Sequence, residues 1–542
     1  MLLALVALLC YTPFSHIGFT CGDDLENYLI TRQGWDACWE HAKWLAGQQG
    51  RFYFLIAQPC YDLAWAIDDW GYTHALQYGM LLISYLLFAR LLQMIFHSRP
   101  LTYLTLLLLI VQTPITENNH MPFMAYPFVF AFSCSLMWLA LLQYVRYCGN
   151  AKYKHLIFCA LLFFAASLFY ENYILFLAFL FLFNLLRWWR GKGFFAMWSS
   201  RKFYTEQIPF VSVIVIYAAL YLSYRSYQMH INPDVAFYSG ASLSDQFSLP
   251  NFFRVLGRCT RTVLPMQNFE RYHEVCTTNY LGYGAIDSKR FALTNASTRV
   301  YVVALAVGLL IYLLLGRIRT ERWSLRSILC VMGIAIVWAF FSHTLIGITP
   351  KYNNDWYCWM NGYVTTYYSF FGIILSMIMI GLLLVKLFSQ RRLLAMGVRL
   401  GLALLMMVFV IIGGYANENL SHEWQRSQSR FFEIDRLHSE GAFQSLPRNA
   451  ILYTEELYSS SAWGSSLTKE YDFIDRYIRM RTGLYFDCAH DEQHLNELLS
   501  HYPPAPLYQL KQEELPHTAR VVVSIYHVSG NIFDNKDQST EL

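Results

Sequence analysis

Long apolar runs recur along the chain from Met1 to about residue 415, and short polar segments separate them. A helix needs about 20 apolar residues to cross a bilayer, so these runs predict about eleven membrane-spanning helices. The stretch from Leu156 to Trp188 fits either one over-long helix or two short helices meeting at Tyr170-Glu171-Asn172. Two helices are favoured, because a carboxylate within lipid is costly. The expected spans are 1–19, 75–96, 101–115, 123–145, 155–170, 172–188, 207–224, 299–316, 326–348, 363–387 and 398–415.

Longer polar segments interrupt or follow these spans. The last of them combines an apolar helical repeat that begins at Trp424 with strand-like runs such as Val521–Tyr526. We therefore expect an α-helical polytopic membrane protein with a small α/β domain at its C-terminal end. The expected units are a membrane domain, 1–415, with large loops at 20–74 and 225–298, and a C-terminal domain, 416–542.

Basic residues are concentrated on every second connection between the expected spans. The first long loop, 20–74, holds more acidic than basic residues. Because positively charged loops stay in the cytoplasm, we expect the amino terminus inside, and both large loops and the C-terminal domain outside. The expected location is a bacterial inner membrane. The basic residues on the expected cytoplasmic side are Arg99, Arg146, Lys152, Lys154, Arg187, Arg190, Lys192, Arg201, Lys202, Arg317, Arg319, Arg322, Arg326, Lys386, Arg391, Arg392 and Arg399.

The composition agrees with a membrane protein and excludes some functions. Hydrophobic residues make up 56% of the 542 positions and charged residues 14%, against roughly 25% charged in soluble domains. The basic residues are scattered over short loops rather than gathered on one face, which argues against a nucleic-acid partner. No segment resembles a dinucleotide-binding domain, so a cytosolic nucleotide sugar is not an expected substrate.

Two adjacent carboxylates, Asp23 and Asp24, directly follow the first expected span. Neighbouring carboxylates raise each other's pKa, so one of them is suited to act as a general base on an acceptor hydroxyl. The other would orient that hydroxyl or bind a divalent cation such as Mg²⁺ or Mn²⁺. A simpler interpretation is an acidic first turn of a loop helix, stabilised by the helix dipole.

This arrangement resembles the GT-C superfamily of membrane glycosyltransferases. Its members have many spans, a catalytic Asp or Asp-Asp just past the first helix, further acids on short outer loops, and often a C-terminal domain outside the membrane. The resemblance covers the architecture of the whole chain, and at residue level it rests on Asp23-Asp24 and a few looser matches. It implies transfer of a sugar from a polyprenyl-phosphate donor to a glycan, lipid or protein acceptor at the outer surface.

The resemblance also implies a second acidic residue on the loop between the third and fourth spans. Glu117 is the carboxylate of that loop, and His120 lies near it. Both would approach Asp23 and Asp24 to complete an acceptor site, or a metal site formed by Asp23, Asp24 and Glu117. A polar turn that satisfies helix ends is the alternative.

Three further residues are candidate acceptor or auxiliary contacts. Glu26 and Tyr28 follow the acidic pair in the same segment. Glu171 lies at the membrane boundary between two apolar runs, where a carboxylate is a functional hypothesis by default. Glu171 fits an ordinary outer turn equally well.

A phosphate-linked donor needs cations at the outer surface. Arg254, Arg258 and Arg261 share one face of an amphipathic helix, and arginine forks suit phosphate oxygens. The same helix would also rest among lipid headgroups and touch bulk lipid phosphates. Lys351, beside aromatic residues after the ninth span, takes the place where several GT-C relatives carry an Arg-Tyr pair.

The expected function is therefore a polyprenyl-phosphate-sugar-dependent glycosyltransferase, with no cofactor other than the divalent cation. A flippase or transporter of lipid-linked glycans is an alternative, and it predicts charged residues within the spans, for which Arg90 and His343 are the main candidates. An O-antigen polymerase or ligase is another, with its catalytic residues in loop 225–298 around His273. A structural or sensory membrane protein, working through its C-terminal tail, is the third.

Overall fold

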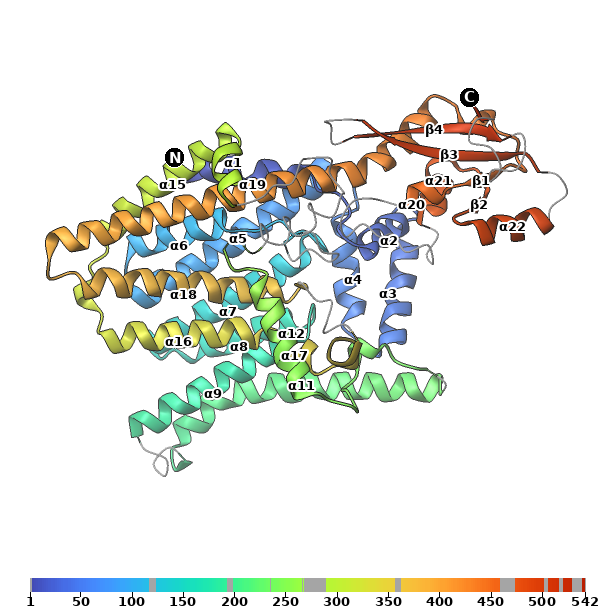
Figure 1. The fold of residues 1–542 in the computed structure, drawn as a ribbon. Coiled ribbons are helices and arrows are strands. Elements are labelled where there is room, and N and C mark those ends of the chain that lie inside the picture. Colours follow the sequence, from blue (N-terminus) through green and yellow to red (C-terminus); the bar gives the residue numbers. More distant parts are fainter. Residues whose placement is uncertain are drawn as a thin grey trace.

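The chain is mostly helical in the computed structural model. The structure describes residues 2–541, apart from 117–122, 193–197, 234, 266, 268–288, 356–361, 459–472, 502–504, 516–519 and 529–538. The helices form a bundle, and a small sheet domain lies beyond one of its ends (Figure 1). Within these described residues, six helices are long and apolar enough to cross a membrane, and five shorter apolar helices accompany them. The protein is a multi-pass integral membrane protein.

The apolar helices follow the predicted spans. The stretch from Leu156 to Trp188 forms two helices, α8 and α9, that meet at a short turn containing Glu171, which confirms the two-helix prediction. The apolar helices are α1 (Leu2–Tyr11), α5 (Trp70–Phe96), α6 (Arg99–Val111), α7 (Val129–Asn150), α8 (Tyr153–Ser167), α9 (Asn172–Lys192), α11 (Arg201–Ile231), α15 (Thr298–Arg317), α16 (Leu325–Phe341), α18 (Thr366–Leu387) and α19 (Arg392–Ser439).

Several predicted spans have different ends. The span predicted at 123–145 begins only at Val129, and the span predicted at 207–224 extends over Arg201–Ile231. The first helix stops at Tyr11 and continues as a 3-10 turn, η1 (Thr12–His16), because Pro13 has no N–H to donate within an α-helix. The predicted span 326–348 is broken at His343, whose buried ring bonds Thr365 Oγ1 at 2.8 Å, and a short turn, α17 (Thr344–Gly347), follows. The last helix, α19, does not end at residue 415 and runs on to Ser439.

Aromatic side chains fill the centre of the bundle. Trp138 on α7 is almost fully buried, and its ring centroid lies 4.7 Å from that of Phe88 on α5 and 4.8 Å from that of Phe371 on α18. Such tilted ring pairs add stabilisation of about 0.5–1.5 kcal/mol beyond the burial of area. These contacts hold α5, α7 and α18 together.

Short helices cover one end of the bundle, where α3 and α4 run across the direction of the spanning helices (Figure 1). The first group of short helices ends at Asp69, which caps the start of α5 by accepting a hydrogen bond from the Gly71 N–H at 2.8 Å. The short elements are α2 (Gly22–Thr31), α3 (Trp35–Gln49), α4 (Phe54–Leu63), η2 (Ser239–Ala241), α12 (Leu249–Arg261), α14 (Lys289–Asn295), and a π-helical turn, η4 (Lys351–Asp355). One 3-10 turn, η3 (Thr320–Arg322), lies between α15 and α16.

The C-terminal domain is a mixed sheet with helices. Its strand order is β2-β1-β3-β4-β5, in which β1 is parallel to β2 and β3, while β4 is antiparallel to β3 and β5. Val521, Val523 and Ile525 alternate into the core, as a strand with one buried face requires. The elements are η5 (Phe443–Ser445), β1 (Ile451–Tyr453), α20 (Glu455–Tyr458), α21 (Phe473–Thr482), β2 (Asp487–Ala489), α22 (Glu492–His501), β3 (Leu507–Glu514), β4 (Val521–Val528) and β5 (Ser539–Glu541).

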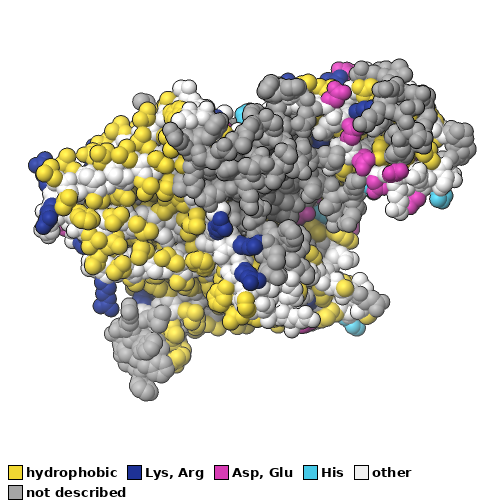
Figure 2. Space-filling view, viewed as in Figure 1, with side chains coloured by type: hydrophobic (Ala, Val, Ile, Leu, Met, Phe, Trp, Pro, Cys, Tyr) yellow, Lys and Arg dark blue, Asp and Glu magenta, His cyan; other side chains and the backbone are white. Residues whose placement is uncertain are grey.

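The two ends of the bundle differ in charge. We call the end that carries α2 to α4 and the C-terminal domain the domain face. The opposite end, at which α6 begins with Arg99, α15 ends with Arg317 and α19 begins with Arg392, is the basic face. Figure 2 shows Lys and Arg at this end, an apolar surface over the helices, and acidic side chains on the C-terminal domain.

Candidate functional site

Asp24 is a buried carboxylate whose two oxygens are both occupied. Oδ2 accepts hydrogen bonds from the Thr20 N–H at 3.1 Å and the Thr20 hydroxyl at 2.7 Å, and Oδ1 accepts one from the Tyr126 N–H at 2.9 Å. Burial raises the pKa of Asp24 to about 6, although these hydrogen bonds act in the opposite direction. Asp24 therefore ties the start of α2 to the segment before α7.

Asp23 lies in the same helical turn but is exposed to solvent. Its Oδ2 accepts a hydrogen bond from the Tyr126 hydroxyl. The two neighbouring acids thus contact the same residue in different ways, Asp24 through the backbone of Tyr126 and Asp23 through its side chain. Of the two, Asp23 has the carboxylate that a substrate can reach.

Tyr126 has an unusual backbone conformation, with φ at 49°, and Phe128 has φ at 79°. Side chains other than glycine pay roughly 1–2 kcal/mol in this left-handed region. Hydrogen bonds stabilise this strained backbone. Asp24 accepts one from the Tyr126 N–H, and Gln77 accepts one from the Phe128 N–H and donates one to the Phe123 carbonyl. Strained backbone of this kind gathers at functional sites.

Aromatic rings connect Asp23 to a second charged group. The centroid of Tyr126 lies 5.4 Å from Tyr61 and 5.6 Å from Phe130, and Phe130 lies 5.5 Å from Tyr170. We call Tyr61, Tyr126, Phe130 and Tyr170 the aromatic row. The residue after Tyr170 is Glu171, which begins the charged group at the far end of the row.

Glu171 is paired rather than free. Its Oε1 lies 2.9 Å from Arg51 Nη2, and both side chains are largely buried. Arg51 also donates to the Gly240 carbonyl at 2.6 Å, so it links the first loop, the α8–α9 turn and η2. Arg51 therefore balances the charge of Glu171. The role of Glu171 as an acceptor contact stays a prediction.

Lys351 lies in a second aromatic group, formed by Tyr238, Tyr352 and Tyr363. Its Nζ donates to the Tyr238 hydroxyl and lies 5.5 Å from the Tyr352 ring centroid, and that ring is 5.1 Å from Tyr363. Burial raises the pKa of Tyr363, and Tyr238 and Asp23 add smaller contributions in the same direction. Lys351 therefore joins the segment of Tyr238 to η4.

Glu26 and Tyr28 point away from this group and toward the C-terminal domain. Glu26 pairs with Arg476 of α21, and the Tyr28 hydroxyl donates to Asp68 at 2.8 Å. Asp68 is in turn paired with Arg481 of α21, at 2.6 Å. Both side chains are occupied by contacts that hold the C-terminal domain against α2.

Arg254, Arg258 and Arg261 lie on α12, with Val255, Leu256 and Cys259 buried on its other side. Arg254 donates to Asn251 Oδ1 at 3.3 Å, and Arg261 donates to Gln267 Oε1 at 2.6 Å. Asn353 joins α12 to η4, because it accepts from the Ser248 N–H at 2.7 Å and its carbonyl accepts from Asn251 at 2.9 Å. The arginine helix and Lys351 thus belong to one local structure.

Glu117 and His120 lie outside the described residues, as does His273. Among the residues that the structure does describe, no three His, Cys, Asp or Glu side chains gather in a way that would hold a metal ion. The metal site predicted from Asp23, Asp24 and Glu117 stays a prediction.

Sequence reasoning missed several residues of this region. Arg51 was passed over because a lone arginine in an acidic loop has no spacing pattern, although basic residues are scarce on this side of the protein. Tyr126 and Tyr363 fall within the predicted spans 123–145 and 363–387, where aromatic residues carry no distinguishing signal. Their positions depend on contacts with α2 and η4, far away in the sequence.

Comparison with solved structures gives likenesses in overall structure. The chain matches the crystal structure of ArnT from Cupriavidus metallidurans in the apo state, with 12% sequence identity, 97% of each chain covered and a TM-score of 0.36. No family model matches the sequence, and no curated protein matches it significantly. A likeness at this identity and TM-score does not establish which reaction the protein catalyses.

Proposed function

We propose that the protein is a membrane glycosyltransferase that takes a sugar from a polyprenyl-phosphate carrier and transfers it at the domain face. The observation that carries this proposal is the difference in burial and hydrogen bonding between the neighbouring acids Asp23 and Asp24. Asp24 is buried and fully bonded, while Asp23 is exposed and bonded to the hydroxyl of a strained tyrosine. A reactive carboxylate held by a rigid partner is what general base catalysis requires.

In the proposed reaction, Asp23 takes the proton from an acceptor hydroxyl. The acceptor oxygen then forms a bond to the anomeric carbon of the donor sugar, and the bond from that carbon to the phosphate oxygen breaks. The polyprenyl phosphate leaves with the bonding electrons. Cations near the departing oxygen lower the barrier, because they stabilise the charge as it develops.

The cations proposed for the donor phosphate are the arginines of α12, namely Arg254, Arg258 and Arg261, together with Lys351. Support comes from Asn353, which ties their two elements together. The tyrosines that contact Lys351 and Asp23 offer hydroxyl groups and flat faces suited to a sugar ring. The acceptor would then enter from the exposed side of Asp23.

A comparison of three variants tests this proposal. Asp23→Asn, Asp24→Asn and Asp36→Asn are expressed in membranes supplied with a polyprenyl-phosphate-linked sugar, and transfer to the acceptor is measured. Asp36 is an exposed acid of α3 in the same loop and serves as the matched control. We expect Asp23→Asn to lower the rate by at least about a hundredfold, the usual effect of losing a general base. Asp36→Asn should retain the rate of the unmodified protein.

Full transfer by folded Asp23→Asn would contradict the proposal. Normal transfer combined with an altered distribution of the lipid-linked sugar between the two leaflets would instead identify a flippase. Loss of transfer without any change in that distribution supports the enzyme.

A further inference from the structure

A large apolar crevice opens at the basic face, on the opposite end of the bundle from Asp23. Its volume is about 1120 Å³, and helices α5, α7, α9, α16 and α18 form most of its wall. This exceeds the roughly 300–1,000 Å³ of ordinary small-molecule pockets, so the crevice is large enough for a lipid. Its deep wall is aromatic and is formed by Phe88, Trp138, Phe176, Trp338 and Phe371.

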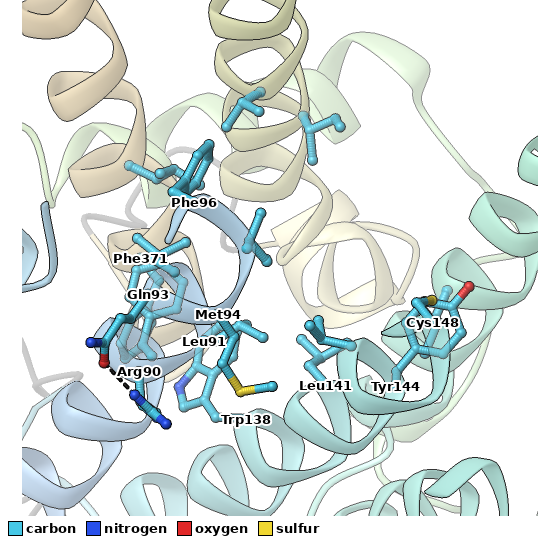
Figure 3. A pocket seen from close by; sticks show the side chains of 18 of the residues that line it. Arg90, Leu91, Gln93, Met94, Phe96, Trp138, Leu141, Tyr144, Cys148 and Phe371 are labelled. Carbon is cyan, nitrogen blue, oxygen red and sulfur yellow. Dashed lines mark hydrogen bonds between the residues drawn. The ribbon is translucent and has the colours of Figure 1, made fainter. Parts of the chain in front are cut away.

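The mouth of the crevice is basic. Arg90, Arg99 and Arg146 line it together with His97 and Asn150, and neither aspartate nor glutamate is among its lining residues. All three arginines are exposed, and none forms an ion pair with a described residue. Figure 3 shows Arg90 bonded to Gln93 near Met94 and Trp138, with Leu141, Tyr144 and Cys148 along α7.

We propose that this crevice binds an anionic phospholipid, whose acyl chains lie against the aromatic wall and whose phosphate lies between Arg90, Arg99 and Arg146. The shape and the charge match a molecule that is apolar for most of its length and negative at one end. Guanidinium groups form paired hydrogen bonds with phosphate oxygens. Basic pockets between spanning helices bind lipid headgroups in this way.

The position of the crevice argues against the sugar carrier as its occupant. The phosphate of that carrier is proposed to react near Asp23, on the domain face, whereas the arginines of the crevice lie on the basic face. The hydrocarbon layer of a bilayer, about 30 Å thick, separates headgroups on the two sides. A phospholipid of the leaflet at the basic face already has its headgroup on the same side as these arginines. Its binding does not depend on the glycosyltransferase proposal.

Retention of added lipid by the detergent-purified full chain tests the site. Phosphatidylglycerol and phosphatidylcholine with identical acyl chains are titrated separately, and the bound lipid is counted by native mass spectrometry. We expect phosphatidylglycerol to be held preferentially, and the variant R90Q/R99Q/R146Q to bind it about tenfold more weakly. The matched control is R326Q/R391Q/R392Q, which removes three exposed arginines of the same face that do not line the crevice; its binding should be unchanged.

A second measurement remains valid if the triple variant fails to fold. Acyl chains brominated near their ends should quench tryptophan fluorescence in the unmodified protein, and W138F/W338F should remove most of that quenching. Equal binding of both phospholipids, or equal loss in the control variant, would show only general lipid contact and overturn the proposal. Displacement of phosphatidylglycerol by a polyprenyl phosphate at lower concentration would overturn it in favour of the carrier lipid.

Discussion

Arg476 of the C-terminal domain forms a two-point ion pair with Glu26, and Glu26 lies one turn after Asp23 on helix α2. Arg481, on the same helix α21, pairs with Asp68 at 2.6 Å and with Asp435 at 2.9 Å. The C-terminal domain is therefore fastened to the helix that carries the proposed general base. This contact makes the domain part of the structure that positions the proposed general base.

Loss of this fastening should reduce activity without abolishing it. In R476Q/R481Q all three ion pairs are removed, and because each is partly exposed it contributes only about 1 kcal/mol or less. We expect kcat to fall about fivefold with little change in KM for the donor, since α2 would move but the donor contacts would remain. Arg479→Gln, on the exposed side of α21, is the control and should have normal kinetics. An unchanged kcat in the double variant would show that the domain does not position α2.

Asp24→Asn should damage the fold more than the chemistry. An amide has one acceptor oxygen, so its NH₂ group must face either the Tyr126 N–H or the two donors of Thr20. We expect the free energy of unfolding to fall by about 1–3 kcal/mol, the cost of an unsatisfied buried group. Thermal unfolding in detergent measures this, and Asp23→Asn should leave the unfolding temperature unchanged. Equal destabilisation by both variants would contradict the separate roles.

Asp24 and Asp62 should each contribute less to stability as the pH rises, because burial raises the pKa of both acids. The pKa of Asp24 is raised to about 6 and that of Asp62 to about 7. A raised pKa in the folded state means that the protonated acid is preferred there, so its contribution is full below about pH 4 and is lost as the pH rises through about 6 to 7. Denaturation midpoints of the unmodified protein and of Asp62→Asn between pH 4 and pH 8 isolate the contribution of Asp62. The stability of the unmodified protein relative to the variant should fall over this range, and a constant difference would exclude Asp62 as a cause.

Arg51 and Glu171 should behave as a unit in mutagenesis. Glu171→Gln leaves the guanidinium of Arg51 largely buried without its partner, which costs about 3 kcal/mol in comparable cases. We expect R51M/E171M to be less destabilised than Glu171→Gln, since replacing both charges removes the uncompensated one. Unfolding of R51M, E171M and R51M/E171M gives the coupling energy. Simple additivity would show that the pair contributes nothing beyond its separate residues.

Much of the architecture was predictable because it follows from local patterns. Apolar runs fixed the positions of the spanning helices, and the turn at Glu171 was expected because a carboxylate is disfavoured in lipid. Helix ends were less predictable. Pro13 and His343 interrupt runs that are apolar on average, so hydropathy alone carried the predicted helices past their true ends.

The candidate site was predictable only in part, because its geometry depends on contacts between distant segments. Asp23 and Asp24 look equivalent in sequence, and their difference arises from Tyr126, a hundred residues later along the chain. Glu26 is a predicted acceptor contact, and the structure pairs it with Arg476, 450 positions away. No spacing rule within one sequence reveals such a partner.

The unbroken helix α19 has a mechanical consequence. Its 48 residues, at about 1.5 Å each, make a rod roughly 72 Å long, which begins at the basic face and ends inside the C-terminal domain. A rod of this length converts a small tilt at one end into a displacement of several ångströms at the other. Because α21 is paired with α2, a thicker or thinner bilayer that changes the tilt of α19 would move Asp23. The rate of the proposed transfer would then depend on the thickness of the membrane around the protein.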